Sequence, residues 1–434
     1  MPDAAPLPIR PTELLDPAEP VVIRQAGRER ADRFLEIDQW AFAFDDTDLD
    51  TGPAIGLIPW DRAFEAWAGD QMAGVYASFT FELTAPGGSV PGVGLRAAGL
   101  TWVGVHPQHR RRGVLTAMMA HHLDDVRAQG EPVSALFAAE PAIYGRFGYG
   151  LASRSLNLTL GRGVSLRDAP GAGGVRVRFE KADADAHSAL VEQVRDGVRL
   201  SRPGEMSRPG TGMQRHAFHD MRAFRQGAET LRIAVAEDAR TGQARGYALF
   251  RRTMHWGEGA AEGTVTVREL TAADPAAARA LWGRLTDLDL MTKLQTDTRP
   301  LDDPLLWMLT DVRAATPRLG DNLWVRIVDV SAALAGRRYA TEVDVVIEVG
   351  DRRLPRNDAR WRLRGGPDTA ECEPTDDVAD LSLDVRELGA AYLGGTSLLS
   401  LAGAGLVTAA SPDAVYRASL AFSSPVAPIC GFMF

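Results

Sequence analysis

The sequence contains few cysteines, and this scarcity excludes whole classes of protein. Only two are present in 434 residues, Cys372 and Cys430. They are too few for a disulfide framework, and they lack the Cys/His spacing of a zinc site. A reduced, cytoplasmic setting without a structural metal is therefore expected.

Long apolar runs and an excess of positive charge are also missing. No stretch approaches the ~18 apolar residues that a membrane-spanning helix needs. Residues 1–19 are rich in proline and acids and lack the apolar segment of a signal peptide, so a loose tail is expected. The net charge of −9 argues against duplex nucleic acid as the main partner. It leaves room for an acidic pocket that attracts cationic molecules.

The chain is too long for one ordinary hydrophobic core, so two or three domains are expected. Alternating strand and helix patterns fill residues 20–165, and residues 166–302 repeat the same strand-to-helix order. From residue 303 the segments NLWVRIVDVSAALAG, YATEVDVVIEVGD and RWRLRGG indicate an antiparallel sheet with helices. The prediction is two tandem α/β units followed by an α+β domain over residues 303–434.

Three consecutive arginines stand directly before a glycine and an apolar helix, in the segment HPQHRRRGVLTAMMAHHL. A strand pattern ends at Val105, Pro107 closes it, and apolar residues at helical spacing predict a helix over 113–128. Helix N-termini bind anions, guanidinium groups suit phosphate, and Gly113 lets the backbone approach a ligand closely. The segment therefore predicts a diphosphate site, with a solvated basic turn as the alternative. A P-loop is excluded because no Lys-Ser/Thr pair follows the glycine.

The order strand, Val-x-Pro-x-x-Arg-x-x-Gly, helix resembles the segment with which GNAT-superfamily N-acetyltransferases hold the pyrophosphate of coenzyme A. Leu115 stands where the general pattern has Gly or Ala, a departure that agrees with one subgroup. Together with AAEPAIYGRFGYG at 138–150, the segment resembles the Eis (enhanced intracellular survival) family of aminoglycoside acetyltransferases. The resemblance implies two GNAT-like domains, the second without a cofactor site, then a sterol-carrier-protein-like domain. It also implies a homohexamer.

The resemblance further implies which residues bind acetyl-CoA. Strand backbone groups would face the pantetheine arm, the arginine loop would cradle the pyrophosphate, and the end of the next strand would touch the cofactor from the other side. The implied cofactor-binding residues are Val103, Gly104, Val105, Arg111, Arg112, Gly113, Val114, Leu115, Thr116, Ala139 and Glu140.

Two residues are implied to act in catalysis. Tyr144 would donate a proton to the departing thiolate, a task that suits a phenol of pKa ~10. Packing is the alternative role for a tyrosine, and Tyr149 is the better candidate for it. The base is implied to be the α-carboxylate of Phe434, at the apolar end APICGFMF, and an end that only packs is the alternative. Met433 stands where relatives carry an acidic residue, which bears on the binding of a cationic substrate.

Three other features are less specific. The segment FDDTDLD at 44–50 is a solvated loop or an acidic rim that attracts polyamines. Trp102 lines the substrate or cofactor channel or belongs to the core. A group of histidines lacks carboxylate or cysteine partners, so no metal site is expected from His106, His109, His121 and His122.

The sequence thus predicts an acetyl-CoA-dependent N-acetyltransferase that transfers acetyl directly to an amine of a polycationic small molecule such as an aminoglycoside. Acetylation of protein lysine or other amines is one alternative. A non-catalytic protein that binds acyl-CoA or a lipid through the third domain is another.

Overall fold

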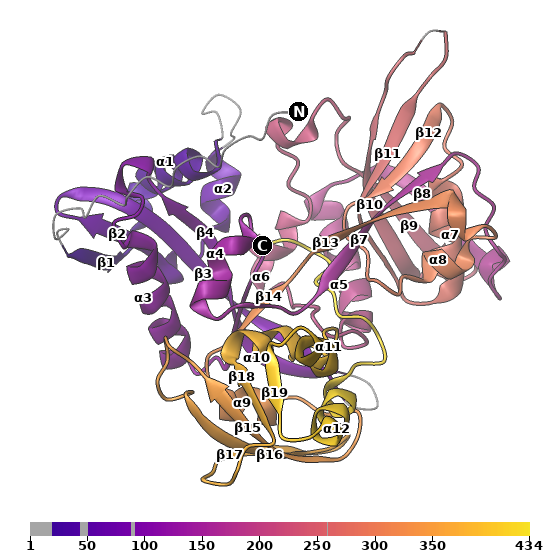
Figure 1. Cartoon of the computed structure of the whole chain (residues 1–434). Coiled ribbons are helices and arrows are strands. Elements are labelled where there is room, and N and C mark those ends of the chain that lie inside the picture. Colours follow the sequence, from indigo (N-terminus) through magenta and orange to yellow (C-terminus); the bar gives the residue numbers. More distant parts are fainter. Residues whose placement is uncertain (1–19, 44–50, 88–91, 258) are drawn as a thin grey trace, which may run out of the picture.

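The computed structural model describes residues 20–43, 51–87, 92–257 and 259–434, which form three β-sheets flanked by helices (Figure 1). The predicted tail 1–19 and the acidic segment 44–50 lie outside the described residues. Within the described ranges, no helix is long and apolar enough to cross a membrane.

The first sheet has seven strands among the described residues, in the order β1-β2-β3-β4-β5-β14-β6. Val75 and Ala77 of β3 pack with Phe34 of α1, whereas Tyr76 packs with Met118 of α3 on the opposite face. The two layers therefore follow from the alternation of side chains along β3. The strands are β1 (Val21–Gln25), β2 (Ala63–Ala68), β3 (Gln71–Ala85), β4 (Val93–Val105), β5 (Val133–Leu136), β14 (Trp324–Ile327) and β6 (Gly150–Leu151), and the helices are α1 (Ala31–Phe42), α2 (Thr51–Leu57), α3 (Val114–Ala128) and α4 (Pro141–Tyr144).

The second sheet has the order β13-β7-β12-β11-β10-β9-β8 and repeats the combination of a mostly antiparallel sheet with one parallel pair, β11 with β12. Two of its helices, α5 and α7, begin at acidic caps: the Asp183 side chain accepts from the Ala186 N–H, and the Asp274 side chain accepts from the Ala277 N–H. The strands are β13 (Ala315–Asp321), β7 (Arg154–Gly161), β12 (Met291–Thr296), β11 (Gly263–Ala272), β10 (Ala244–Thr253), β9 (Arg232–Asp238) and β8 (Val175–Lys181), and the helices are α5 (Ala184–Arg199), α6 (Gly210–His216), α7 (Pro275–Leu285) and α8 (Pro304–Met308).

The third sheet is mixed and not purely antiparallel, which corrects the sequence-based prediction. Strands β15 and β18 pair in parallel from Ile347 and Leu381, while the other pairs are antiparallel. A parallel pair needs a crossover connection, which β16 and β17 provide here. The elements are β17 (Ala370–Pro374), β16 (Ala359–Gly365), β15 (Val343–Gly350), β18 (Leu381–Asp384), β19 (Val407–Ala409), α9 (Val330–Ala335), α10 (Val385–Ala391), α11 (Leu398–Gly403) and α12 (Pro412–Phe422).

The chain crosses between the first two sheets more than once. Strand β7 falls within the range 20–165 but pairs in the second sheet, with β12 and β13. Strand β14 comes from the segment after β13 and inserts between β5 and β6 of the first sheet. Single cuts at residues 165 and 302 therefore do not separate the sheets, and the predicted ranges 20–165, 166–302 and 303–434 stay predictions.

One apolar core joins the first and third sheets. Phe81 and Ala135 of the first sheet belong to the same buried cluster as Ile347 of the third sheet and Tyr392 and Phe422 of the helices beside it. The side of the third domain that faces the first is thus filled by side chains. This shared core holds the C-terminal segment against the first sheet.

Candidate active site

Strands β4 and β5 run in parallel and then part. Their pairing extends from Ala97 opposite Val133 to Gly99 opposite Ala135, whereas β4 continues to Val105. Beyond Gly99 the edge of β4 that faces β5 has no partner strand in the described pairing. The backbone N–H and C=O groups of the last residues of β4 are therefore available to a ligand that lies along this edge.

A β-bulge distorts β4 at this place. Its register against β3 shifts between Val75 and Ala77, so that Trp102 and Val103 oppose the single residue Tyr76. Trp102 has a φ of 55°, a conformation that costs a residue with a side chain roughly 1–2 kcal/mol. The tryptophan is half-buried and contacts Phe34 of α1 at 6.4 Å between ring centroids. It therefore lies in the wall between α1 and the open edge of β4.

The arginine loop follows β4 directly and ends at the N-terminus of α3. Gly113 caps the helix at a φ of 80°, and a carbon added there would meet nothing within 4 Å. Arg111 is exposed, and Arg112 lies with Nη1 3.4 Å from His109 Nδ1. The N–H groups of the first turn, which include those of Val114, Leu115 and Thr116, have no partner within the helix. Open space, a positive helix end and guanidinium groups together can bind a diphosphate.

Strand β5 ends earlier than the sequence pattern indicated. The interpretation placed Ala139 and Glu140 at the strand end, but β5 ends at Leu136 and both residues lie exposed in the following turn. Glu140 is the N-cap of α4, with Pro141 at its first position. Because proline favours the start of a helix, Pro141 explains why α4 begins there. The two residues still follow β5 on the side where β4 and β5 separate.

Tyr144 and Tyr149 occupy different environments. Tyr144 ends α4, is 9% exposed, and has a pKa raised to about 12, mainly by burial and further by Glu140. Tyr149 is completely buried, and its hydroxyl lies 2.8 Å from Ser134 Oγ, which lies 2.8 Å from His122 Nε2. Tyr149 is thus part of an internal hydrogen-bonded chain. Tyr144 keeps its proton at neutral pH.

The C-terminal residue lies at the point where β4 and β5 part. The Phe434 ring is 4.8 Å from that of Phe81 and 5.2 Å from that of Phe137, measured between centroids. A carbon added at Gly99 would lie 2.3 Å from the Phe81 ring and 2.9 Å from the Phe434 ring, so both rings pack closely over this glycine. Figure 1 shows this chain end, marked C, in the middle of the molecule where the three parts meet. Strand β4, which is predicted to bind the cofactor, and the C-terminus, which is predicted to supply the general base, therefore lie together.

Two junctions between domains hold the residues before Phe434. The Asn322 side chain accepts from the Cys430 N–H at 2.9 Å and donates to the Cys430 carbonyl at 3.1 Å. Ser153, at the junction of β6 and β7, donates to the same Asn322 oxygen at 2.8 Å. The Ile429 N–H donates to the Pro203 carbonyl at 3.0 Å. The tail is thus fixed by segments from several parts of the chain.

The second domain contributes a buried charged cluster below the tail. Arg195 and Arg208 lie over the Phe432 ring, at 4.9 and 4.4 Å from its centroid, and both pair with Glu269. Burial alone would raise the pKa of Glu269, but the two arginines outweigh it and lower the pKa to about 2. His216 hydrogen-bonds to the backbone of Met433, whose side chain is 69% exposed. The Phe432 ring and the Met433 backbone are thus held in place, while the Met433 side chain faces solvent.

The histidines of the predicted non-metal group, His106, His109, His121 and His122, contact one another and neighbouring side chains. His121 Nδ1 lies 2.6 Å from the Tyr76 hydroxyl, His122 contacts Ser134, and His106 accepts from the Gln108 N–H at 3.3 Å. Among the described residues, no group of three or more His, Cys, Asp or Glu could hold a metal ion.

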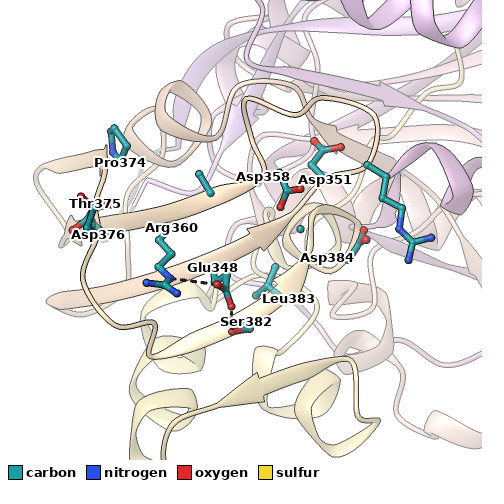
Figure 2. Close-up of a pocket in the computed structure, with 13 residues that line it drawn as sticks. Glu348, Asp351, Asp358, Arg360, Pro374, Thr375, Asp376, Ser382, Leu383 and Asp384 are labelled. Carbon is teal, nitrogen blue, oxygen red and sulfur yellow. Dashed lines mark hydrogen bonds and ion pairs between the residues drawn. The ribbon is translucent and has the colours of Figure 1, made fainter.

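A hollow of about 990 Å³ on the third domain is a separate feature (Figure 2). It lies over β15, β16 and β18, and none of the predicted site residues lines it. Arg360 pairs with Glu348, which also accepts from the Ser382 hydroxyl at 2.9 Å. Because its lining residues all belong to the third domain, the hollow is separate from the site at β4 and β5.

Sequence reasoning missed Gly99, Phe81, Phe137 and Asn322. Their roles arise from contacts with the C-terminal tail, far away in the sequence. No motif marks them.

Comparison with known proteins assigns the class. Family models for an acetyltransferase (GNAT) domain match residues 22–152 and again residues 204–327, and a sterol carrier protein domain matches residues 330–431. The fold and these matches define an N-acetyltransferase with two GNAT domains and a sterol-carrier-protein-like domain.

Individual relatives narrow this class. N-acetyltransferase Eis of Mycobacterium tuberculosis is 35% identical over 392 residues, 87% of this chain and 90% of its own. An uncharacterized N-acetyltransferase of Streptomyces avermitilis is 46% identical over 374 residues, 86% of this chain and 89% of its own. The crystal structure of Eis1 from Mycobacterium abscessus superposes with a TM-score of 0.80 at 32% identity, over 95% of this chain and 100% of that one. The chain belongs to the Eis family of N-acetyltransferases.

Proposed function

We propose that this enzyme transfers acetyl from acetyl-CoA directly to an amine of a polycationic small molecule such as an aminoglycoside. The observation that carries the proposal is the contact of Phe434 with Gly99, at the point where β4 and β5 part. Because Phe434 is the C-terminal residue, its carboxylate is proposed to reach the unpaired edge of β4 that begins beyond Gly99.

Acetyl-CoA is proposed to lie along the open edge of β4. The backbone of Val103 to Val105 would pair with the pantetheine arm, and Ala139 and Glu140 would border it from the β5 side. The pyrophosphate would bind the first turn of α3 between Arg111 and Thr116, where Gly113 leaves open space. The fit is supported by the exposed Arg111 and by the helix N-terminus.

The chemistry is one direct transfer. The acceptor nitrogen attacks the thioester carbonyl carbon, the N–C bond forms and the C–S bond breaks. The proton lost by the amine goes to the Phe434 carboxylate, and the departing thiolate takes the Tyr144 proton. The proton on the carboxylate then returns to the phenolate through solvent, so the products are an acetamide and free coenzyme A. The raised pKa of Tyr144 keeps this proton in place before the reaction.

Two further properties are proposed on indirect grounds. A cytoplasmic location is supported by Cys372 and Cys430, which are both buried and free. A homohexamer is supported by the family resemblance alone.

A turnover assay tests the function. Release of free thiol from acetyl-CoA should be measured with an aminoglycoside, a polyamine, a lysine-containing peptide and a simple monoamine, and the products weighed by mass spectrometry. The proposal expects the highest kcat/KM with the small polycations. A preference for the peptide would favour protein lysine as the acceptor, and no thiol release with any amine would contradict the proposed function.

A further inference from the structure

One buried carboxyl group in the catalytic domain has no structural explanation. Asp38 lies on α1 and is 6% exposed, and its side chain has no hydrogen bond or ion pair among the described residues; its oxygens are not among the fully enclosed unpaired atoms, so they keep contact with solvent. Its neighbours on the buried side of the helix are the apolar Phe34, Leu35 and Ile37. Burying an unpaired carboxylate is costly, and groups of this kind in native proteins concentrate at functional sites.

The position of Asp38 connects it to the candidate site. Helix α1 crosses β4 at the bulge: Phe34 contacts Trp102, and a carbon added at Gly104 would lie 3.5 Å from the Asp38 Cα. Phe34 and Asp38 are four residues apart and so share one face of the helix. Asp38 therefore lies over the segment from Trp102 to Gly104, along which the proposed acetyl-CoA would run.

Helix α1 and the C-terminus cover the same face of the first sheet. Val75 and Ala77 of β3 pack with α1, while Phe81, on the same face by alternation, contacts Phe434. On β4, Gly99 lies next to the Phe434 ring and Gly104 lies next to the Asp38 Cα. At ~3.3 Å per residue, they are on the order of 10–15 Å apart. Two carboxylates thus flank the proposed place of the thioester.

Within the ranges that the structure describes, few charged groups lie near Asp38. The parts of β3 and β4 that face α1, Val75 to Ala77 and Trp102 to Val105, present no titratable side chain on that face. On α1 and the short helix before it, the charged side chains point away or are paired. Asp32 and Arg28 are exposed. Arg33 pairs with Glu36, and Arg30 pairs with both Glu65 and Glu29. His106, which follows β4, packs against Trp40.

We propose that Asp38 binds an ammonium group of a multi-amine acceptor, while another amine of the same molecule is acetylated beside Phe434. The inference rests on the proposed function. It selects acceptors whose cationic groups are on the order of 10 Å apart. Burial raises the pKa of Asp38 to about 7, so an ammonium group would complete a pair that the protein leaves open.

The test compares acceptors of different length in wild type and Asp38→Asn. The two acceptors compared are spermine, which has several amines, and a monoamine such as propylamine. In Asp38→Asn the KM for spermine should rise about tenfold or more, with the KM for propylamine and for acetyl-CoA unchanged. In wild type the KM for spermine should fall as pH rises through about 7, and this dependence should be lost in the variant. Asp32→Asn, an exposed carboxyl on the same helix, is the matched control and should behave as wild type.

The results that would contradict the role of Asp38 differ from those that would contradict the proposed function. Equal KM values for spermine in wild type and Asp38→Asn, or an equal rise for spermine and propylamine, would overturn the role of Asp38 and leave the proposed function intact. Absence of turnover in wild type would remove the proposed function, and this inference with it. Asparagine keeps the shape of the side chain, and a thermal unfolding curve confirms that the variant is folded.

Discussion

Two tyrosines close together in the sequence show how surroundings decide what a phenol can do. Tyr149 is locked in a buried chain with Ser134 and His122, and its burial raises its pKa. Tyr144 lies at the end of α4 with a pKa of about 12. The local sequence IYGRFGYG places a glycine after each tyrosine and does not show their contacts, so the preference for Tyr144 came from the family resemblance. The contacts of Tyr149 assign it to packing.

Exchanging each tyrosine for phenylalanine separates chemistry from packing. Tyr144→Phe should lower kcat roughly 10²–10⁴-fold because it deletes the proton of the proposed acid while keeping the ring. Tyr149→Phe should cost about 1 kcal/mol in the free energy of unfolding because Ser134 loses a partner, with kcat kept. Steady-state kinetics and denaturant titration measure both. A kcat for Tyr144→Phe within twofold of wild type would show that this phenol is not the acid.

Asp38 also predicts how stability depends on pH. Its pKa rises from 3.8 in the unfolded chain to about 7 in the folded protein, so the folded state holds the proton more tightly. Between these two values the unfolded chain has lost a proton that the folded protein keeps. Wild type should therefore lose stability as pH rises from about 4 to about 7, on the order of 4 kcal/mol in all, and then level off.

The measurement is the difference in unfolding free energy between Asp38→Asn and wild type at several pH values. The difference should grow in favour of asparagine from pH 4 to pH 7 and stay constant above pH 8. A difference that does not change with pH would mean that Asp38 ionises normally in the folded protein.

At the scale of elements, local patterns were sufficient for some parts and insufficient for others. The apolar spacing after Gly113 predicted a helix over 113–128, and α3 spans Val114–Ala128. The prediction that Ala139 and Glu140 end a strand overextended β5, because the local pattern cannot show that a helix begins at Pro141. The insertion of β14 into the first sheet had no local signal, since its partners β5 and β6 lie far away in the sequence.

The two ends of α3 provide a matched pair of variants for the cofactor site. Arg111→Ala removes an exposed guanidinium at the N-terminal end, where the pyrophosphate is proposed to bind. Loss of one charge-assisted contact costs about 1.5–3 kcal/mol, so the KM for acetyl-CoA should rise roughly ten- to a hundredfold. Arg127→Ala, exposed at the C-terminal end, should leave the KM unchanged. Equal KM values in Arg111→Ala, Arg112→Ala and wild type would remove the basis of the assignment.

For the whole molecule, the tandem architecture followed from the sequence, but the assembly of the site did not. Repeated strand-to-helix order and the family resemblance predicted two GNAT-like units and a third domain, and the structure and the relatives confirm this fold. The sequence contained the apolar end, but not its partners. Asn322, Pro203 and Gly99 meet the tail only after three sheets have assembled. Such contacts depend on the complete fold and not on local propensity.

The position of the terminal carboxylate is the central claim, because the other domains hold the last residues at β4. Appending a short C-terminal tag converts the Phe434 carboxylate to an amide and leaves its ring in place. Deleting Phe434 instead moves the carboxylate to Met433, up to ~3.5 Å away, whereas proton transfer needs ~2.6–3.2 Å between heavy atoms. An end that only packs would tolerate the tag better than the deletion.

The most direct measurement is the turnover number of the tagged protein, with acetyl-CoA affinity measured on the same sample by calorimetry. We expect turnover to be abolished and acetyl-CoA still to bind, because the arginine loop is distant from the tag. A tagged protein that folds and turns over at the untagged rate would contradict the catalytic terminus.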